Sequence, residues 1–96
     1  MLLKIHKRKD QEVIALCDKV LIGKIFEENN LKLDINENFY KGKEISKEEI
    51  YKIIKNASNV NIVGKKSISW ALKNKLISKS NVIQIKSIPH AQIVSI

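Results

Sequence analysis

Residues 60–77 read VNIVGKKSISWALKNKLI, and this stretch decides the fold that the sequence predicts. A short apolar run ends at Gly64, and an amphipathic helix follows it. A strand that turns into a helix in this way points free backbone N–H groups, and the positive end of the helix dipole, at one position. Because Lys65, Lys66 and Ser67 stand at that position, the sequence predicts an anion-binding corner that suits a phosphate group. A tight turn with solvated lysines is the alternative.

The predicted helix has two different faces. At 100° per residue its apolar residues gather on one side, which we expect to cover a sheet, while Lys66, Trp70 and Lys73 fall on the opposite side. A tryptophan between lysines fits a surface that stacks on a nucleobase and pairs with phosphates. Burial of Trp70 against another part of the chain, or against a second subunit, is the alternative.

The GKKS run does not extend to a nucleotide-binding P-loop. That motif needs a glycine five positions before its Gly-Lys pair, and Asn59 stands there. The several glycines of a dinucleotide-binding turn are missing as well. No catalytic constellation is present elsewhere, which favours a binding protein over an enzyme.

The flanking sequence completes a mixed sheet. Alternating and continuous apolar residues predict an antiparallel hairpin over residues 2–17, an extended pair around residues 24–36, and strands over residues 82–85 and 88–96. Ser46 and Glu49 form a capping box that begins a helix over residues 46–57. The sequence therefore predicts a single α/β or α+β domain over residues 1–96, whose C-terminal strand, helix and strand form a right-handed crossover.

Two shorter segments complete this prediction. Asp18 is placed to cap a short helical turn that Gly23 ends. Phe39 and Tyr40 fall in a loop that we expect to close one edge of the core.

Charge is distributed unevenly along the chain. The formal net charge is +8, and all ten acidic residues lie at or before Glu49, so the second half carries the whole excess of lysine. Such asymmetry indicates a polyanionic partner, most often a nucleic acid. An AT-rich gene would also raise the lysine content, although it would not remove the acids.

Other residues limit the remaining classes of function. No apolar run is long enough to span a bilayer, Lys4 interrupts the N-terminal apolar residues at once, and Cys17 has no second cysteine to pair with. These features predict a cytoplasmic protein that is not associated with a membrane. We expect no metal site and no cofactor, because His6, Cys17 and His90 are not spaced as ligand pairs. His90 and Gln92 lie two residues apart on a predicted strand, so both could contact a ligand or satisfy a buried loop.

Four segments stand out along the chain: ALCD (residues 15–18), LIGK (21–24), NIVG (61–64) and IPHAQ (88–92). Together they resemble DUF424, an archaeal family of small proteins with a domain of unknown function. The resemblance implies an archaeal, cytoplasmic protein and assigns no activity to any residue.

The leading functional hypothesis is a small RNA-binding accessory protein that works near the translation machinery. Its lysine-rich half would neutralise phosphates, while Trp70 or the turn at His90 would contact bases. The first alternative is a binding module or enzyme for a phosphorylated small molecule, with the Gly64 corner as its site. The second is an interaction subunit or homodimer with Trp70 at the interface.

Overall fold

The N-terminal hairpin forms one edge of a five-stranded sheet in the computed structural model, which describes residues 1–94. Two segments with 3₁₀ geometry, η1 and η2, accompany the strands and helices. In chain order the elements are β1 (Leu2–Arg8), β2 (Gln11–Cys17), η1 (Lys19–Leu21), β3 (Ile25–Glu28), β4 (Leu31–Asp34), α1 (Glu37–Tyr40), α2 (Lys47–Lys55), β5 (Asn59–Val63), α3 (Lys65–Lys73), η2 (Lys79–Asn81), β6 (Val82–Ile85) and β7 (Ile88–Val94).

The sheet is mixed, as the sequence predicted. Its strand order is β1-β2-β5-β7-β6, and β2 and β5 run parallel while every other neighbouring pair is antiparallel. Strands β5 and β6 therefore point the same way, as expected, but β7 lies between them. Lys86 and Ser87, with φ values of 52° and 64°, turn the chain tightly enough to fold β7 back beside β6. Ile96, expected at the end of this last strand, lies outside the described residues.

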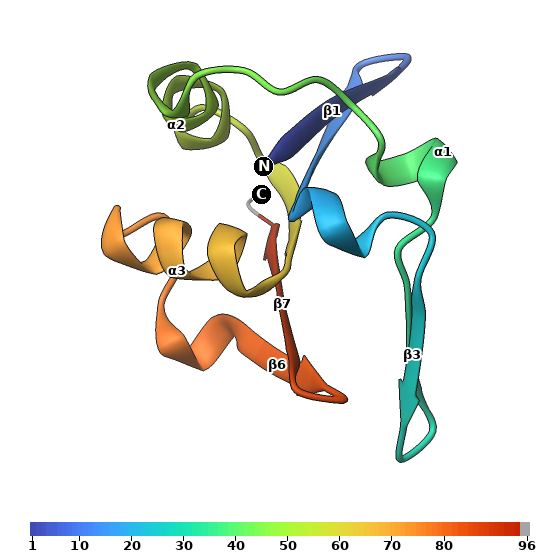
Figure 1. The fold of residues 1–96 in the computed structure, drawn as a ribbon. Helices are drawn as coiled ribbons and strands as arrows, with labels where there is room; N and C mark the ends of the chain where they lie inside the picture. The colour runs from blue at the N-terminus through green and yellow to red at the C-terminus, as the bar shows by residue number, and fades with distance from the viewer. Residues whose placement is uncertain (95–96) are drawn as a thin grey trace.

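Two layers cover the two faces of the sheet (Figure 1). Helices α2 and α3 pack on one face, where Val60 and Ile62 of β5 are buried in the larger apolar cluster. Helix α1 and the β3–β4 hairpin cover part of the other face, toward which Cys17 and Val63 point. Because successive strand residues point to opposite faces, β5 supplies apolar residues to both layers.

Helix α2 begins as the capping box predicts. The Ser46 hydroxyl accepts a hydrogen bond from the Glu49 backbone N–H at 3.2 Å. Ile50 and Ile54, at 1% and 2% exposure, form the buried stripe. The sequence pattern alone thus located this helix correctly, and its last residue is Lys55.

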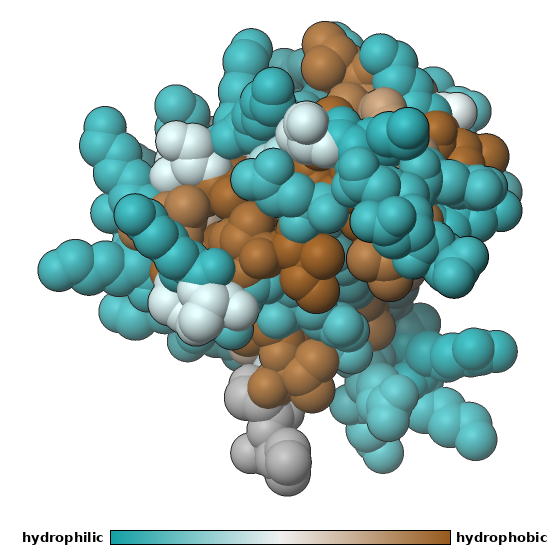
Figure 2. Space-filling model, turned by 90° about the horizontal axis from the view of Figure 1, so that it is seen from below, coloured by the Kyte–Doolittle hydropathy of each residue, from teal (hydrophilic) through white to brown (hydrophobic). Residues whose placement is uncertain are grey.

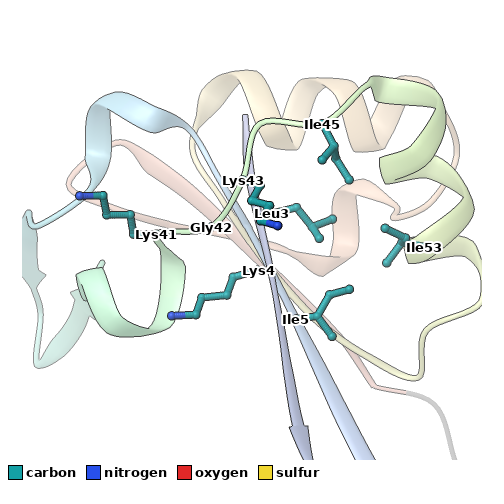
Figure 3. A pocket seen from close by; sticks show the side chains of 8 residues that line it. All are labelled: Leu3, Lys4, Ile5, Lys41, Gly42, Lys43, Ile45 and Ile53. Carbon is teal, nitrogen blue, oxygen red and sulfur yellow. The ribbon is translucent and has the colours of Figure 1, made fainter.

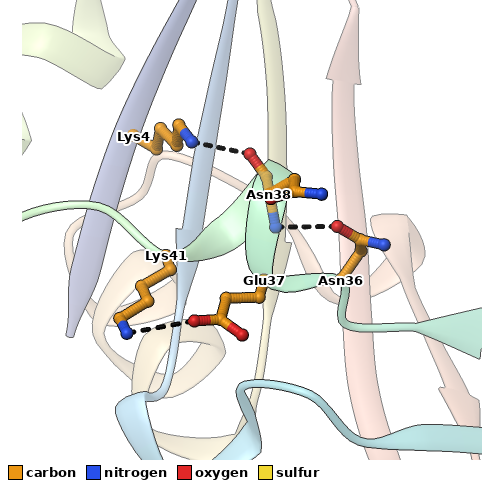
Figure 4. Close-up of polar contacts among 5 residues, drawn as sticks. All are labelled: Lys4, Asn36, Glu37, Asn38 and Lys41. Carbon is orange, nitrogen blue, oxygen red and sulfur yellow. Dashed lines mark hydrogen bonds and ion pairs between the residues drawn. The ribbon is translucent and has the colours of Figure 1, made fainter.

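The segment with Phe39 and Tyr40 is a short helix, whereas the sequence predicted a loop. Its first turn is capped by the Asn36 carboxamide oxygen, which accepts from the Asn38 backbone N–H at 2.7 Å (Figure 4). From β1, the Lys4 ammonium donates to the Asn38 carbonyl oxygen at 2.6 Å. The loop prediction failed because the cap is a single asparagine without the apolar periodicity that marks longer helices.

None of the helices in residues 1–94 is both long enough and apolar enough to cross a lipid bilayer.

Candidate nucleic-acid interface

The N-terminus of α3 is occupied by an anion that belongs to the chain itself. The Asp18 carboxylate accepts hydrogen bonds from the backbone N–H groups of Lys66 and Ser67, at 3.0 and 2.8 Å, and from the Ser67 hydroxyl at 2.7 Å. Asp18 is only 6% exposed and Ser67 is fully buried. A negative side chain here satisfies orphan N–H groups and opposes the positive end of the helix dipole.

Gly64 makes this contact sterically feasible. Its φ of 111° lies in a region that side chains other than glycine rarely adopt. A Cβ at this position would also overlap the carboxylate of Asp18. Gly64 therefore serves the approach of an internal carboxylate to the helix.

The anion-binding corner that the sequence predicted needs correction on one point. The backbone donors of Lys66 and Ser67 are already bonded, so an external phosphate would have to displace Asp18 to reach them. Asp18 itself was expected to cap η1, yet its side chain makes no capping hydrogen bond there. The exposed side chains of Lys65 and Lys66 are still available to an external anion at this corner.

Trp70 of α3 faces helix α2. It is partly buried against the larger core cluster. Together with Tyr51 and Asn74 it also lines a shallow groove of about 420 Å³, which we call the α2–α3 groove. The Asn74 carboxamide donates to the Trp70 carbonyl oxygen at 2.8 Å, which holds this end of α3. The indole is thus packed along one edge and accessible along the groove.

Tyr51 is the residue that sequence reasoning missed. It stands outside the apolar stripe of α2 and reaches the same groove as Trp70, although the two are 19 positions apart in the chain. Lysines 47 and 52 also line the groove, together with Glu48. The Lys55 ammonium lies 5.7 Å from the centre of the Tyr51 ring, in cation–π range. The signal available in the sequence was an aromatic residue on the polar face of a helix.

His90 and Gln92 do not join this groove. They share the face of β7 that points away from α3, because the intervening Ala91 is buried in the cluster beneath the helices. His90 is half-buried opposite Val63, and burial lowers the pKa of its imidazole below the usual value. Gln92 is exposed at the same face. The predicted site residues thus form two separate groups on opposite sides of the sheet.

The other aromatic residues are mainly structural. His6 stacks on Phe39 with ring centres 4.6 Å apart, and Phe39 meets the Tyr40 ring edge-on at 4.9 Å. Tyr40 is buried, which raises the pKa of its hydroxyl to about 12. These contacts close the core below α1, whereas Tyr51 and Trp70 line the groove between α2 and α3.

Residues 1–94 contain no group of three or more His, Cys, Asp or Glu side chains placed to hold a metal ion. Apolar side chains also reach the surface. Figure 2 shows apolar side chains in the middle of the face seen from below, between groups of hydrophilic residues. Among the exposed apolar residues are Ile25, Leu31, Ile83 and Val94.

A family model described as "Protein of unknown function (DUF424)" matches residues 6–96. The chain belongs to this family. A crystal structure of an uncharacterized conserved protein from Methanopyrus kandleri is similar, with a TM-score of 0.78 and 27% sequence identity. The alignment covers 96% of this chain and 88% of that one. No curated relative matches the chain. Membership in DUF424 confirms the resemblance carried by the ALCD, LIGK, NIVG and IPHAQ segments.

Proposed function

We propose that this DUF424 protein is a small RNA-binding accessory protein, and that the α2–α3 groove holds single-stranded RNA. The observation that supports this most is the pair of Tyr51 and Trp70 in one shallow groove bordered by lysines. Aromatic rings stack on any base, and lysines that track the backbone neutralise its phosphates. Both elements of single-strand recognition therefore meet on the same surface.

Lysines surround this groove on both helices. Lys66 and Lys73 are exposed on α3 at the helical spacing of Trp70, and Lys52 and Lys55 extend from α2. No acidic residue follows Glu49 in the sequence. A phosphate chain crossing the groove would thus meet mainly positive charge, and among residues 1–94 Glu48 is the one acidic side chain that lines it. A cytoplasmic place near the translation machinery is part of this proposal, because RNA is concentrated there.

The geometry favours RNA over a phosphorylated metabolite. A small phosphate ligand would rely on the backbone donors at the start of α3, and Asp18 already accepts from them. His90, the acid or base considered for such chemistry, lies on the opposite side of the sheet. The groove needs neither of these groups, since its recognition depends on ring faces and exposed ammonium groups.

Trp70 provides a direct assay because it is the single tryptophan of the chain. Titration with a ten-residue oligouridine should quench its fluorescence, whereas heparin, a polyanion without bases, should bind without comparable quenching. With three to four phosphates contacted, affinity should fall roughly 20- to 50-fold between 50 and 200 mM salt. Absence of binding at low salt, or equal quenching by heparin, would contradict the proposal.

Matched variants locate the site. Tyr51→Ala should weaken oligouridine binding about five- to 160-fold, the usual range for one stacked base. Lys73→Glu should weaken it and reduce the salt dependence, while Lys32→Glu makes the same charge change on β4 and should leave binding nearly unchanged. Equal losses in both lysine variants would indicate attraction by net charge alone.

A further inference from the structure

The outer edge of β1 is open along most of its length. At Leu3, this edge exchanges two backbone hydrogen bonds with Lys43, both of 3.0 Å. In an antiparallel ladder the backbone groups of alternate residues point the same way, so Ile5 and Lys7 also direct theirs outward. Within residues 1–94, no inter-element backbone hydrogen bond reaches this edge beyond Leu3. The strand thus offers unused donors and acceptors over residues 5–8.

An apolar groove of about 490 Å³ lies directly beside this edge. Figure 3 shows the side chains of Leu3, Ile5, Ile45 and Ile53 converging on it from β1, the loop before α2, and α2. Ile5 is 41% exposed, although it is a large apolar residue in the middle of a strand. A strand added at the edge would point alternate side chains toward the helix layer and into this groove.

The chain itself demonstrates pairing at this edge. The loop residue Lys43 makes one antiparallel bridge to Leu3 before the chain leaves for α2. Gly42 permits the close approach, because a Cβ there would overlap the Leu3 carbonyl group. One further strand continuing past this bridge would extend geometry that the fold already uses.

The charged residues of β1 and of the groove beside it indicate which kind of partner strand would bind there. Strand β1 carries Lys4, Lys7 and Arg8 and no acidic residue, and Lys41 and Lys43 also line the groove. Lys7 lies 4.0 Å from Glu12 and Lys41 lies 3.0 Å from Glu37, so Lys4, Arg8 and Lys43 supply most of the positive charge that a partner would meet. Pairing with β1 of a second copy would bring these like charges together, which opposes self-association. A strand with acidic side chains would meet opposite charge instead.

We propose that the outer edge of β1 binds an acidic, extended peptide segment of a partner protein. The segment adds as a strand beside residues 5–8, accepts and donates the outward backbone hydrogen bonds, and places an apolar side chain over Ile5 and Ile53. Backbone pairing supplies the affinity, while the groove and the lysines supply the selectivity. This surface is separate from the α2–α3 groove, so it adds a protein partner to the proposed RNA-binding function.

The test uses the wild-type protein and a fluorescein-labelled peptide, Glu-Val-Asp-Val-Glu-Val-Asp, followed by fluorescence anisotropy. Two further peptides carry N-methyl groups on alternate amides, in the two complementary patterns. Only one pattern blocks the amides that face β1, so one peptide should bind at least about tenfold more weakly and the other nearly as well as the parent. No binding of the parent peptide, or equal effects of the two patterns, would overturn the proposal.

Variants then locate the surface. Lys43→Glu should weaken peptide binding at least about fivefold, and Lys32→Glu, far from this edge, should not. Saturating oligouridine should leave peptide binding unchanged, because the two surfaces are distinct. Light scattering provides the remaining check, since a dimer that Ile5→Glu dissociates would identify the edge as a self-interface and overturn the assignment.

Discussion

Replacing Asp18 with alanine should destabilise the protein more than any other single change of a carboxylate. The substitution removes the acceptor for three hydrogen bonds, from the Lys66 N–H, the Ser67 N–H and the Ser67 hydroxyl. Ser67 has no exposed surface, so its two donors are shielded from bulk solvent when the carboxylate is removed. The change therefore leaves buried polar groups unpaired at the start of α3.

The size of the effect follows from these contacts. Each buried donor left without a partner costs roughly 1–3 kcal/mol, and loss of the charge at the helix terminus adds about 0.5–1 kcal/mol. Removing a carboxylate that is itself costly to bury offsets part of this sum. We expect the free energy of unfolding to fall by about 3–4 kcal/mol, a large share of the roughly 5–15 kcal/mol typical of a small domain.

Urea denaturation followed by circular dichroism measures this difference. Asp34→Ala is the matched control, because Asp34 is exposed on β4 and its removal should change stability by less than about 0.5 kcal/mol. Ser67→Ala in the Asp18→Ala background should cost much less than in the wild type, since the hydroxyl has already lost its acceptor. Similar losses for Asp18→Ala and Asp34→Ala, or additive effects of the two changes at Asp18 and Ser67, would refute the reasoning.

Three further predictions concern individual residues. Gly64→Ala should destabilise the protein by at least about 2 kcal/mol more than Gly23→Ala in the same urea assay, because both glycines have positive φ but only Gly64 leaves no room for a Cβ beside Asp18. Burial lowers the pKa of His90, so the unfolded chain binds more protons there. The contribution of His90 to the free energy of unfolding should therefore be greatest above pH 6.5, the usual pKa of histidine. It should decline as the pH falls below that value. In the His90→Gln variant, the urea midpoint should depend less on pH below 6.5 than it does in the wild type. An unchanged dependence would contradict the assignment of this effect to His90. Burial, with a smaller contribution from Asp18, raises the pKa of Cys17 to about 11, so its thiol should react with a disulfide reagent at pH 8 much more slowly in buffer than in urea. Equal rates would show that the thiol is not protected.

Local patterns in the sequence determined much of the fold. The capping box at Ser46, the hairpin of β1 and β2, and the strand-to-helix turn at Gly64 each depend on residues within a few positions of one another. Such elements can be predicted because their hydrogen bonds and apolar periodicity are short-range. The lysines on the polar face of α3 were located in the same way.

The tertiary structure decided what those elements bring together. Parallel pairing of β2 with β5 places Cys17 opposite Val63. The residues that follow them, Asp18 and Gly64, therefore lie together at the carboxyl ends of these two strands. The predicted phosphate corner thereby acquired an internal carboxylate. Likewise, packing of α2 beside α3 placed Tyr51 in a groove with Trp70. Strand order and helix packing join residues that are distant in the chain, and no local propensity specifies them.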